Sequence, residues 1–250
     1  MKQHFSTGVQ DLLARHGLDS FEALWKLELA TVDEPNTGRG GWSSVCRLDL
    51  EGQGFYLKRQ SNYLIRSLRH PLGEPTFARE FRNIHRYREL HIPALDAAYF
   101  GQRRRDGKVQ AILLTRALDG WDDLEAWLGR WPALTEKQRV AILQRCGELA
   151  GTVHSARQVH GCFYPKHIFL RPQGEAFDVC LIDLEKTRPA WFGQRDRTRD
   201  LEPLIRRASA WTEAEIRQLL ASYVGEGAHS AEVEAWLSRL SIRRRYKEAR

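Results

Sequence analysis

The hydrophobic pattern of this chain changes its period near the middle, and this change constrains the fold most strongly. Residues 44–50 alternate between apolar and polar side chains, and another apolar stretch, residues 55–58, follows a short turn at residues 51–54. Alternation with a period of two is typical of strands with one buried face. After Thr135, apolar residues recur at the three- and four-residue spacing of amphipathic helices. Strands followed by helices predict an α+β protein.

The elements expected from these patterns divide the chain into two parts. In the first part we expect short helices over residues 6–16 and from residue 19, strands over 27–32, 44–50, 55–58, 97–101 and 109–115, and a helix over 77–90. In the second part we expect strands over 168–170 and 177–183, and helices over 124–128 and after Thr135, Thr212 and Ser230. Thr135 and Thr212 each begin a capping box. We therefore expect a β-rich part over residues 1–116 and a helical part over residues 117–250.

The composition is that of a folded, basic protein. Hydrophobic residues make up 42% and charged residues 28% of the chain, which argues against disorder. The net charge of +7 favours an anionic partner such as a nucleotide, a nucleic acid, an anionic lipid or a phosphorylated sugar. A solvated basic surface without a partner is the alternative. Because no recognition motif of nucleic-acid-binding proteins is visible, we expect no nucleic-acid partner.

Nothing in the sequence indicates export or a membrane span. No apolar run approaches the roughly 20 residues that a transmembrane helix needs, and residues 1–10 lack the apolar segment of a signal peptide. The four cysteines form no C-x-x-C pair and no zinc-type spacing, so we expect free thiols in a reducing compartment. We therefore expect a cytoplasmic protein.

A glycine-rich turn lies between the first two strands of the alternating region. The pattern G-x-G-x-x-G-x-V is met at Gly38, Gly40 and Val45, and Ser43 replaces the third glycine. A turn between two strands excludes a Rossmann or Walker motif, whose glycines precede a helix, and suits the flap that kinases fold over ATP phosphates. Taken alone the pattern is weak, and an ordinary glycine-rich hairpin is the alternative.

Two charged residues follow at positions that suit the same chemistry. Lys58 ends an apolar strand, where an ammonium group can reach α- and β-phosphates. Glu80 lies in the helix expected over residues 77–90, near its apolar side, and could hold Lys58 through an ion pair. A lysine on an edge strand and a glutamate on a helix surface are the alternatives, so this assignment depends on the second half of the chain.

The second half contains the layout of a kinase catalytic loop. Residues 160–170 follow the long helix and correspond to H-x-D-x-x-x-x-N followed by an apolar strand, with His160 and His167 in the first and last positions. Asp183 then follows a second apolar strand, as the metal-binding aspartate of D-F-G does. Hairpin, lysine, glutamate, loop and aspartate occur in the expected order, which is much more specific than any one of them.

On these residues the chain resembles the lipopolysaccharide kinase family, which includes heptose and Kdo kinases and InaA-type proteins. The resemblance covers about residues 27 to 205 and implies a bilobal protein-kinase-like fold, with ATP and Mg²⁺ as cofactors and transfer of a phosphoryl group to a sugar hydroxyl. It implies that Gly38, Gly40, Ser43, Val45 and Lys58 lie at the nucleotide, with Glu80 anchoring Lys58. It also implies that Asp183 binds magnesium and that His167 occupies the second metal position. Imidazole suits magnesium less well than oxygen ligands do, so His167 could instead hold phosphate or orient Asp183.

The largest departure from the family pattern is Cys162, which stands where the catalytic aspartate belongs. A thiol, with a reference pKa of about 8.5, is a poor base at neutral pH. Either another carboxylate substitutes for it, with Asp178, Glu185 and Asp200 as candidates, or the protein is a pseudokinase that serves as a nucleotide-binding or stress-response interaction module. For Asp200 we expect a structural role instead, because it resembles the aspartate at a helix start that braces the catalytic loop.

Two basic stretches suggest where an anionic acceptor would bind. The first covers residues 58–70, with Arg59, Arg66 and Arg69, and the second covers residues 243–247. We expect an anionic sugar or glycolipid as the acceptor and a peripheral contact with the inner membrane face through these stretches. A solvated surface is the equal alternative.

Overall fold

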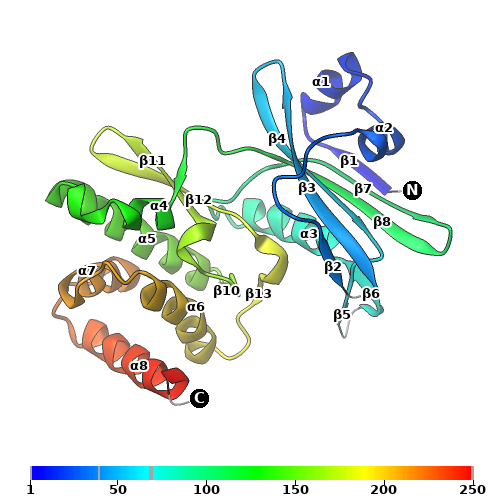
Figure 1. The fold of residues 1–250 in the computed structure, drawn as a ribbon. Coiled ribbons are helices and arrows are strands. Elements are labelled where there is room, and N and C mark those ends of the chain that lie inside the picture. The colour runs from blue at the N-terminus through cyan, green and yellow to red at the C-terminus, as the bar shows by residue number, and fades with distance from the viewer. Residues whose placement is uncertain (1, 39, 68–69, 249–250) are drawn as a thin grey trace. The chain divides into compact units, whose positions relative to one another are not determined.

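The computed structural model describes residues 2–38, 40–67 and 70–248. The chain folds into two compact units, which are described separately (Figure 1). Unit 1 comprises Met1–Arg86 and Leu95–Asp119, and unit 2 comprises Tyr87–Ala94 and Gly120–Arg250. The expected α+β class is confirmed, with an antiparallel sheet in the first unit and mostly helices in the second.

A six-stranded antiparallel sheet with the order β1-β7-β8-β4-β3-β2 forms the centre of unit 1. Its strands are β1 (Lys2–Phe5), β2 (Asn36–Gly38), β3 (Gly41–Leu50), β4 (Gln53–Ser61), β7 (Ala97–Arg105) and β8 (Lys108–Arg116). A small hairpin of β5 (Leu64–Ser67) and β6 (His70–Pro75) leads into α3 (Thr76–Glu89). Two short helices, α1 (Val9–Arg15) and α2 (Phe21–Lys26), precede β2.

The alternation in β3 and β4 produces two different faces of this sheet. Leu48, Leu50 and Leu57 face the buried core that α1 and α2 complete, where Leu12 and Phe21 also lie. Side chains at neighbouring positions of a strand point to opposite faces. Lys58 therefore points away from this core, toward α3, where Glu80 lies.

Unit 2 is built from five α-helices and short strands. The helices are α4 (Leu124–Gly129), α5 (Glu136–Ser155), α6 (Gln194–Arg207), α7 (Glu213–Val224) and α8 (Ala231–Glu248). The strands are β9 (Asp122–Asp123), β11 (Ile168–Gln173) and β12 (Ala176–Leu181) in one small sheet, and β10 (Gln158–Val159) and β13 (Arg188–Pro189) in another. Both predicted capping boxes are confirmed, at Thr135 before α5 and at Thr212 before α7.

The prediction of a strand over residues 27–32 is wrong. This segment is irregular except for an isolated bridge between Thr31 and Cys46. The guanidinium of Arg59 donates hydrogen bonds to the carbonyl oxygens of Trp25 in α2 (2.9 Å) and of Leu27, the first residue of this segment (2.7 Å). The Arg59 side chain thus satisfies a backbone group at the start of the segment that a strand would have paired in a ladder.

Helix α6 is the element that the sequence predicts least well. Its buried side chains include Asp196, Asp200 and Glu202, so its inner face does not have an apolar pattern. Asp200 lies inside this helix rather than at its start, where we expected it.

In the described part of the chain, no helix is both long and apolar enough to cross a bilayer.

Candidate active site

In unit 1, Lys58 and Glu80 form a partly buried ion pair. Lys58 Nζ lies 2.7 Å from Glu80 Oε1, and the two side chains are 17% and 4% exposed. Strand β4 supplies the lysine and helix α3 supplies the glutamate, as expected from the sequence. The carboxylate holds the ammonium group in one place and leaves its remaining hydrogens free to donate to an anion.

The glycine-rich turn is the hairpin between β2 and β3. Gly38 ends β2, Gly40 adopts a positive φ of 75° in the turn, and Gly41 begins β3. A Cβ atom at Gly41 would lie 2.2 Å from the carbonyl oxygen of Ser61, so only glycine fits there. Arg39, within the pattern, lies outside the described residues.

The register of the sheet connects this hairpin to Lys58. Val45 is the direct cross-strand partner of Lys58, and Ser43 is the partner of Gln60. The hairpin therefore leads along β3 to the position opposite the lysine. The structure brings the expected residues of unit 1 onto three adjacent strands and one helix, with Ser43 buried between its neighbours.

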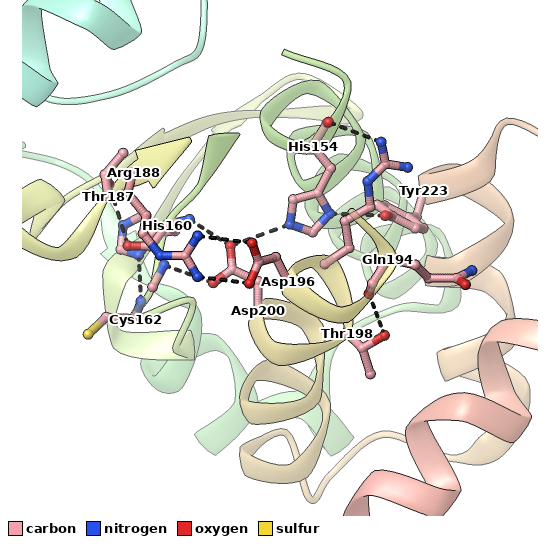
Figure 2. A network of polar contacts seen from close by, with 12 residues as sticks. His154, His160, Cys162, Thr187, Arg188, Gln194, Asp196, Thr198, Asp200 and Tyr223 are labelled. Atoms are coloured by element: carbon pink, nitrogen blue, oxygen red, sulfur yellow. Dashed lines mark hydrogen bonds and ion pairs between the residues drawn. The ribbon is translucent and has the colours of Figure 1, made fainter. Parts of the chain in front are cut away.

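In unit 2, Asp200 of α6 holds the backbone of the expected catalytic loop (Figure 2). Its carboxylate accepts hydrogen bonds from the N–H groups of His160 (2.6 Å) and Gly161 (2.8 Å), and His154 Nε2 lies 3.4 Å away. Asp200 is only 3% exposed. The bracing role expected for Asp200 is confirmed, and the same contacts occupy the carboxylate, so it is no substitute for a catalytic base.

His160 stabilises the loop from inside. The Cys162 N–H donates to His160 Nδ1 at 3.3 Å, so the ring proton is on Nε2, which donates to the carbonyl oxygen of Ile182 at 2.9 Å. Complete burial lowers the pKa of His160, so it stays neutral. His160 thus connects the loop to the segment that carries Asp183.

His167 and Asp183 meet at the end of this loop. His167 Nδ1 lies 2.8 Å from the carbonyl oxygen of Cys162, and a carbonyl oxygen can only accept, so Nδ1 carries the proton. Burial lowers the pKa of His167, which keeps the ring neutral. Its Nε2 lone pair then faces Asp183 Oδ2 at 3.4 Å. Two acceptors facing each other lack a donor between them.

This arrangement fits a cation. Asp183 is half-exposed, with a backbone φ of 59° in the left-handed region, which for a residue with a side chain stores strain. Such strained positions cluster at functional sites. No cluster of three or more histidine, cysteine or acidic side chains that would suit a metal occurs among the described residues. Two protein ligands are nevertheless usual for magnesium bound together with phosphates, since Mg²⁺ keeps several waters and phosphate oxygens.

Cys162, at the expected base position, is a buried thiol. Cys162 is only 3% exposed. Burial raises the pKa of its thiol, although the Lys186 ammonium group beside it acts to lower this pKa. At neutral pH the thiol therefore carries its proton and cannot accept another from a hydroxyl. Of the other carboxylates considered, Asp178 is engaged in an ion pair of 2.7 Å with Arg171.

Lys186 is a residue of this site that sequence reasoning missed. It ends the short 3-10 helix Leu184–Lys186, three residues after Asp183, and the Cys162 thiol beside its ammonium group raises the pKa of Lys186. The carbonyl oxygen of Lys186 would lie 2.8 Å from a Cβ atom at Gly161, which has a φ of 79°. The sequence signal for Lys186 was its position three residues after Asp183. Its approach to Cys162 depends on the turn at Leu184–Lys186, which hydrophobic periodicity does not reveal.

Two residues of the basic stretches expected to bind an anionic acceptor are engaged within the protein. Lys58 is paired with Glu80, and Arg59 donates to backbone carbonyl groups. Arg69 and the side chains of residues 243–247 lie outside the described residues. Arg66 is exposed.

Residues 22–223 match the family model described as the lipopolysaccharide kinase (Kdo/WaaP) family. The chain belongs to this family. Among curated proteins, this lipopolysaccharide kinase family member is 27% identical to Protein InaA of Escherichia coli (strain K12) over 207 residues, which cover 82% of this chain and 95% of InaA. The resemblance inferred from the sequence is therefore confirmed.

A solved structure titled "WaaP in complex with acyl carrier protein" shares the fold of this family member. The TM-score is 0.70, the sequence identity is 22%, and the match covers 97% of this chain and 99% of the other. At this level of identity the likeness shows the fold alone, and it confirms the kinase-like architecture expected from the sequence.

Proposed function

We propose that this protein is an ATP-dependent kinase that phosphorylates a sugar hydroxyl of the lipopolysaccharide inner core. Membership in the lipopolysaccharide kinase family supports phosphotransfer and the use of ATP. The observation that carries the proposal is the ion pair between Lys58 and Glu80, directly opposite Val45 of the glycine-rich hairpin. A lysine fixed by a buried glutamate beside such a hairpin suits the phosphates of a nucleotide.

In this proposal each unit contributes one part of the chemistry. The hairpin at Gly38 and Gly40 directs backbone N–H groups at phosphate oxygens, and Lys58 neutralises their charge. Asp183 and the Nε2 atom of His167 hold Mg²⁺, and ATP supplies the phosphoryl group. Because phosphoryl transfer depends mainly on positioning and on charge neutralisation, these residues account for most of what the reaction requires.

The acceptor follows from the charge of the chain and from its family. A net charge of +7 suits an anionic sugar or glycolipid, and the family description names lipopolysaccharide. We therefore propose a cytoplasmic protein with a peripheral contact at the inner face of the inner membrane, where it would meet a glycolipid acceptor.

The second candidate is a pseudokinase that binds a nucleotide without transferring its phosphoryl group. Cys162 supports it, because a buried thiol with a raised pKa stands where the hydroxyl proton would be accepted. Loss of a general base costs about 10²- to 10⁴-fold in rate. The two candidates share the nucleotide site and differ only in turnover.

Magnesium-dependent ATP binding, measured as a shift in the unfolding temperature, tests the shared part. We expect ATP with Mg²⁺ to stabilise the protein by about 2.7 kcal/mol at 100 times its Kd. The shift should disappear in Lys58→Ala and Asp183→Asn, and it should persist in the matched controls Lys137→Ala and Asp178→Asn. Lys137 is an exposed lysine, and Asp178 of β12 pairs with Arg171 of β11. No stabilisation of the wild type would contradict both candidates.

Turnover separates the two candidates. Release of ADP in the presence of lipopolysaccharide inner-core oligosaccharide, absent in Asp183→Asn, supports the kinase. ATP binding without release of ADP, under the same conditions, supports the pseudokinase and contradicts the kinase.

A further inference from the structure

The loop between β13 and α6 in unit 2 exposes two large aromatic side chains next to each other. Trp191 is 69% exposed and Phe192 is 62% exposed. Four other tryptophans of the same unit, Trp127, Trp131, Trp211 and Trp236, are at most 6% exposed. Single exposed apolar residues are common, but adjacent large ones indicate a contact surface.

The backbone of this loop is held firmly, although its aromatic side chains are not covered. Asp196, in the first turn of α6, accepts a hydrogen bond from the Phe192 N–H at 3.1 Å. The same carboxylate accepts hydrogen bonds from both terminal nitrogens of Arg188, at 2.8 and 2.9 Å (Figure 2). Asp196 is 1% exposed, so its hydrogen bonds are shielded from water. The two exposed rings therefore lie on a loop whose backbone is anchored to α6.

Arg188 also contacts the ring of Trp191. Its guanidinium carbon lies 5.2 Å from the centre of the Trp191 ring, within the range of a cation–π contact. Arg188 thus joins the buried carboxylate of Asp196 to the exposed indole. Trp191 is presented to the outside with one face supported and the rest of the ring open.

All of the exposed charge on the helix that follows is positive. Its exposed charged residues are all arginines, namely Arg195, Arg199, Arg206 and Arg207, whereas its acidic residues Asp196, Asp200 and Glu202 are buried. Arg195 and Arg199 lie one helical turn apart, directly after the aromatic loop. None of the described residues forms an ion pair with either of them.

We propose that Trp191, Phe192, Arg195 and Arg199 form a surface that binds an anionic lipid bilayer. Tryptophan is enriched at the boundary between headgroups and hydrocarbon, and the neighbouring phenylalanine adds apolar area that can enter the same layer. Arginines at the same edge attract the negative surface potential of anionic lipids. The surface combines the two features that stable peripheral binding needs, apolar insertion and positive charge.

A bilayer suits this surface better than a folded acidic protein does. The two rings project from a short loop, as their exposure shows, and a flat deformable layer accepts such a projection without a complementary pocket. This surface shares no residue with the basic stretches at residues 58–70 and 243–247, and it involves none of the residues proposed to bind ATP. The proposal therefore holds for an active kinase and for a pseudokinase alike.

Flotation with phosphatidylcholine vesicles, with and without phosphatidylglycerol, tests the proposal on the full chain. We expect the wild type to float only with the anionic vesicles, and less at higher salt. Trp191→Ala/Phe192→Ala should lower the partition coefficient by at least about tenfold. Arg195→Gln/Arg199→Gln should lower it by about 25-fold, at about fivefold for each arginine.

Matched controls separate this surface from the general charge of the chain. Arg104→Gln/Lys108→Gln removes the same charge from an exposed hairpin of unit 1, and Leu72→Ala removes a side chain that is 90% exposed. Both controls should float like the wild type. An equal loss in the control pair, no flotation of the wild type, or unchanged flotation of the aromatic variant would overturn the proposal.

A label provides a second measurement that does not require a binding-deficient variant to fold. The four native cysteines are buried, so an environment-sensitive fluorophore can be attached selectively to Phe192→Cys. We expect its emission to shift to the blue with anionic vesicles and to stay unchanged with a fluorophore at Leu72→Cys. A shift with polyglutamate but not with vesicles would assign the surface to an acidic protein and overturn the proposal.

Discussion

The ion pair in unit 1 and the loop in unit 2 match the expected kinase pattern in two different ways. In unit 1 the side chains themselves are those that nucleotide chemistry calls for, since Lys58 and Glu80 are paired at 2.7 Å. In unit 2 hydrogen bonds with Asp200 and His160 hold the backbone of the loop, while position 162, where the sequence predicts a base, carries the buried thiol of Cys162. None of the loop-bracing hydrogen bonds involves the thiol. Loop geometry and proton acceptance are therefore separable in this protein.

Restoring a carboxylate at position 162 tests this separation most strongly. We expect Cys162→Asp to raise ATP-dependent turnover by about 10²- to 10⁴-fold, because the loop already holds position 162 and lacks only a base. Measurement of ADP release with a sugar acceptor reads the change. Cys162→Asn, of similar size and without a base, should stay at the wild-type rate; an equal rise in both variants would show that volume at position 162, not proton acceptance, limits the reaction.

Removing the brace of the loop should affect stability rather than chemistry alone. Asp200→Ala leaves the N–H groups of His160 and Gly161 buried and unpaired, which costs about 1 to 3 kcal/mol for each group. We expect the free energy of unfolding to fall by about 4 kcal/mol in urea titrations. Asp200→Asn keeps one acceptor oxygen and should lose less than half as much. Equal losses in both would contradict the hydrogen-bond explanation.

The ion pair of unit 1 should respond differently to single and double substitution. Lys58→Met leaves the carboxylate of Glu80, 4% exposed, without its partner, and we expect a loss of about 3 kcal/mol in the free energy of unfolding. Lys58→Met/Glu80→Met removes both charges and should recover most of this loss. ATP binding should be absent in both variants. A double variant as unstable as the single one would show that packing, not an unpaired charge, sets the cost.

A glycine of the loop tests how closely the two segments of unit 2 approach. In Gly161→Ala the new methyl group meets the carbonyl oxygen of Lys186 at 2.8 Å and forces alanine to a φ of 79°. We expect a loss of about 2 kcal/mol in stability. Gly174→Ala has a similar positive φ with open space around it, and it should cost less. If the two variants lose the same stability, the contact with Lys186 has no energetic weight.

The smallest expected effect is a loss of stability at low pH, caused by protonation of Asp196 next to the aromatic loop. Arg188 holds the pKa of Asp196 down at about 2, below its usual value of 3.8. A carboxylate with a lowered folded-state pKa contributes stability that is complete above about pH 4 and is lost as the pH falls toward 2. Unfolding titrations between pH 5 and pH 2 should show this loss in the wild type and a flatter dependence in Asp196→Asn. Identical slopes would remove the ion pair as the cause.

The sequence predicts the parts of this molecule whose stability comes from regular patterns. Alternation predicted β3 and β4, and the capping boxes predicted the starts of α5 and α7. The prediction of a strand over residues 27–32 failed in a segment whose first carbonyl group, that of Leu27, accepts a hydrogen bond from Arg59, far along the chain. Such a partner cannot be read from local periodicity.

The candidate site shows the same limit. Order and spacing, together with the family resemblance, placed Lys58, Glu80, His167 and Asp183 on the right elements, although their roles stay predictions. The contact of Lys186 with Cys162 depends on the turn at Leu184–Lys186, and the inner face of α6 is acidic rather than apolar. Both features depend on polar contacts between segments that are distant in the sequence. Such contacts leave no periodic pattern of residues that could predict them.

Two carboxylates one turn apart in α6 have a mechanical consequence. Asp196 grips the loop that carries Trp191 and Phe192, and Asp200 grips the backbone at His160 and Gly161. About 6 Å of helix axis therefore separates the carboxylate that binds the aromatic loop from the one that binds the expected catalytic loop. We expect a displacement of this turn to move both loops together.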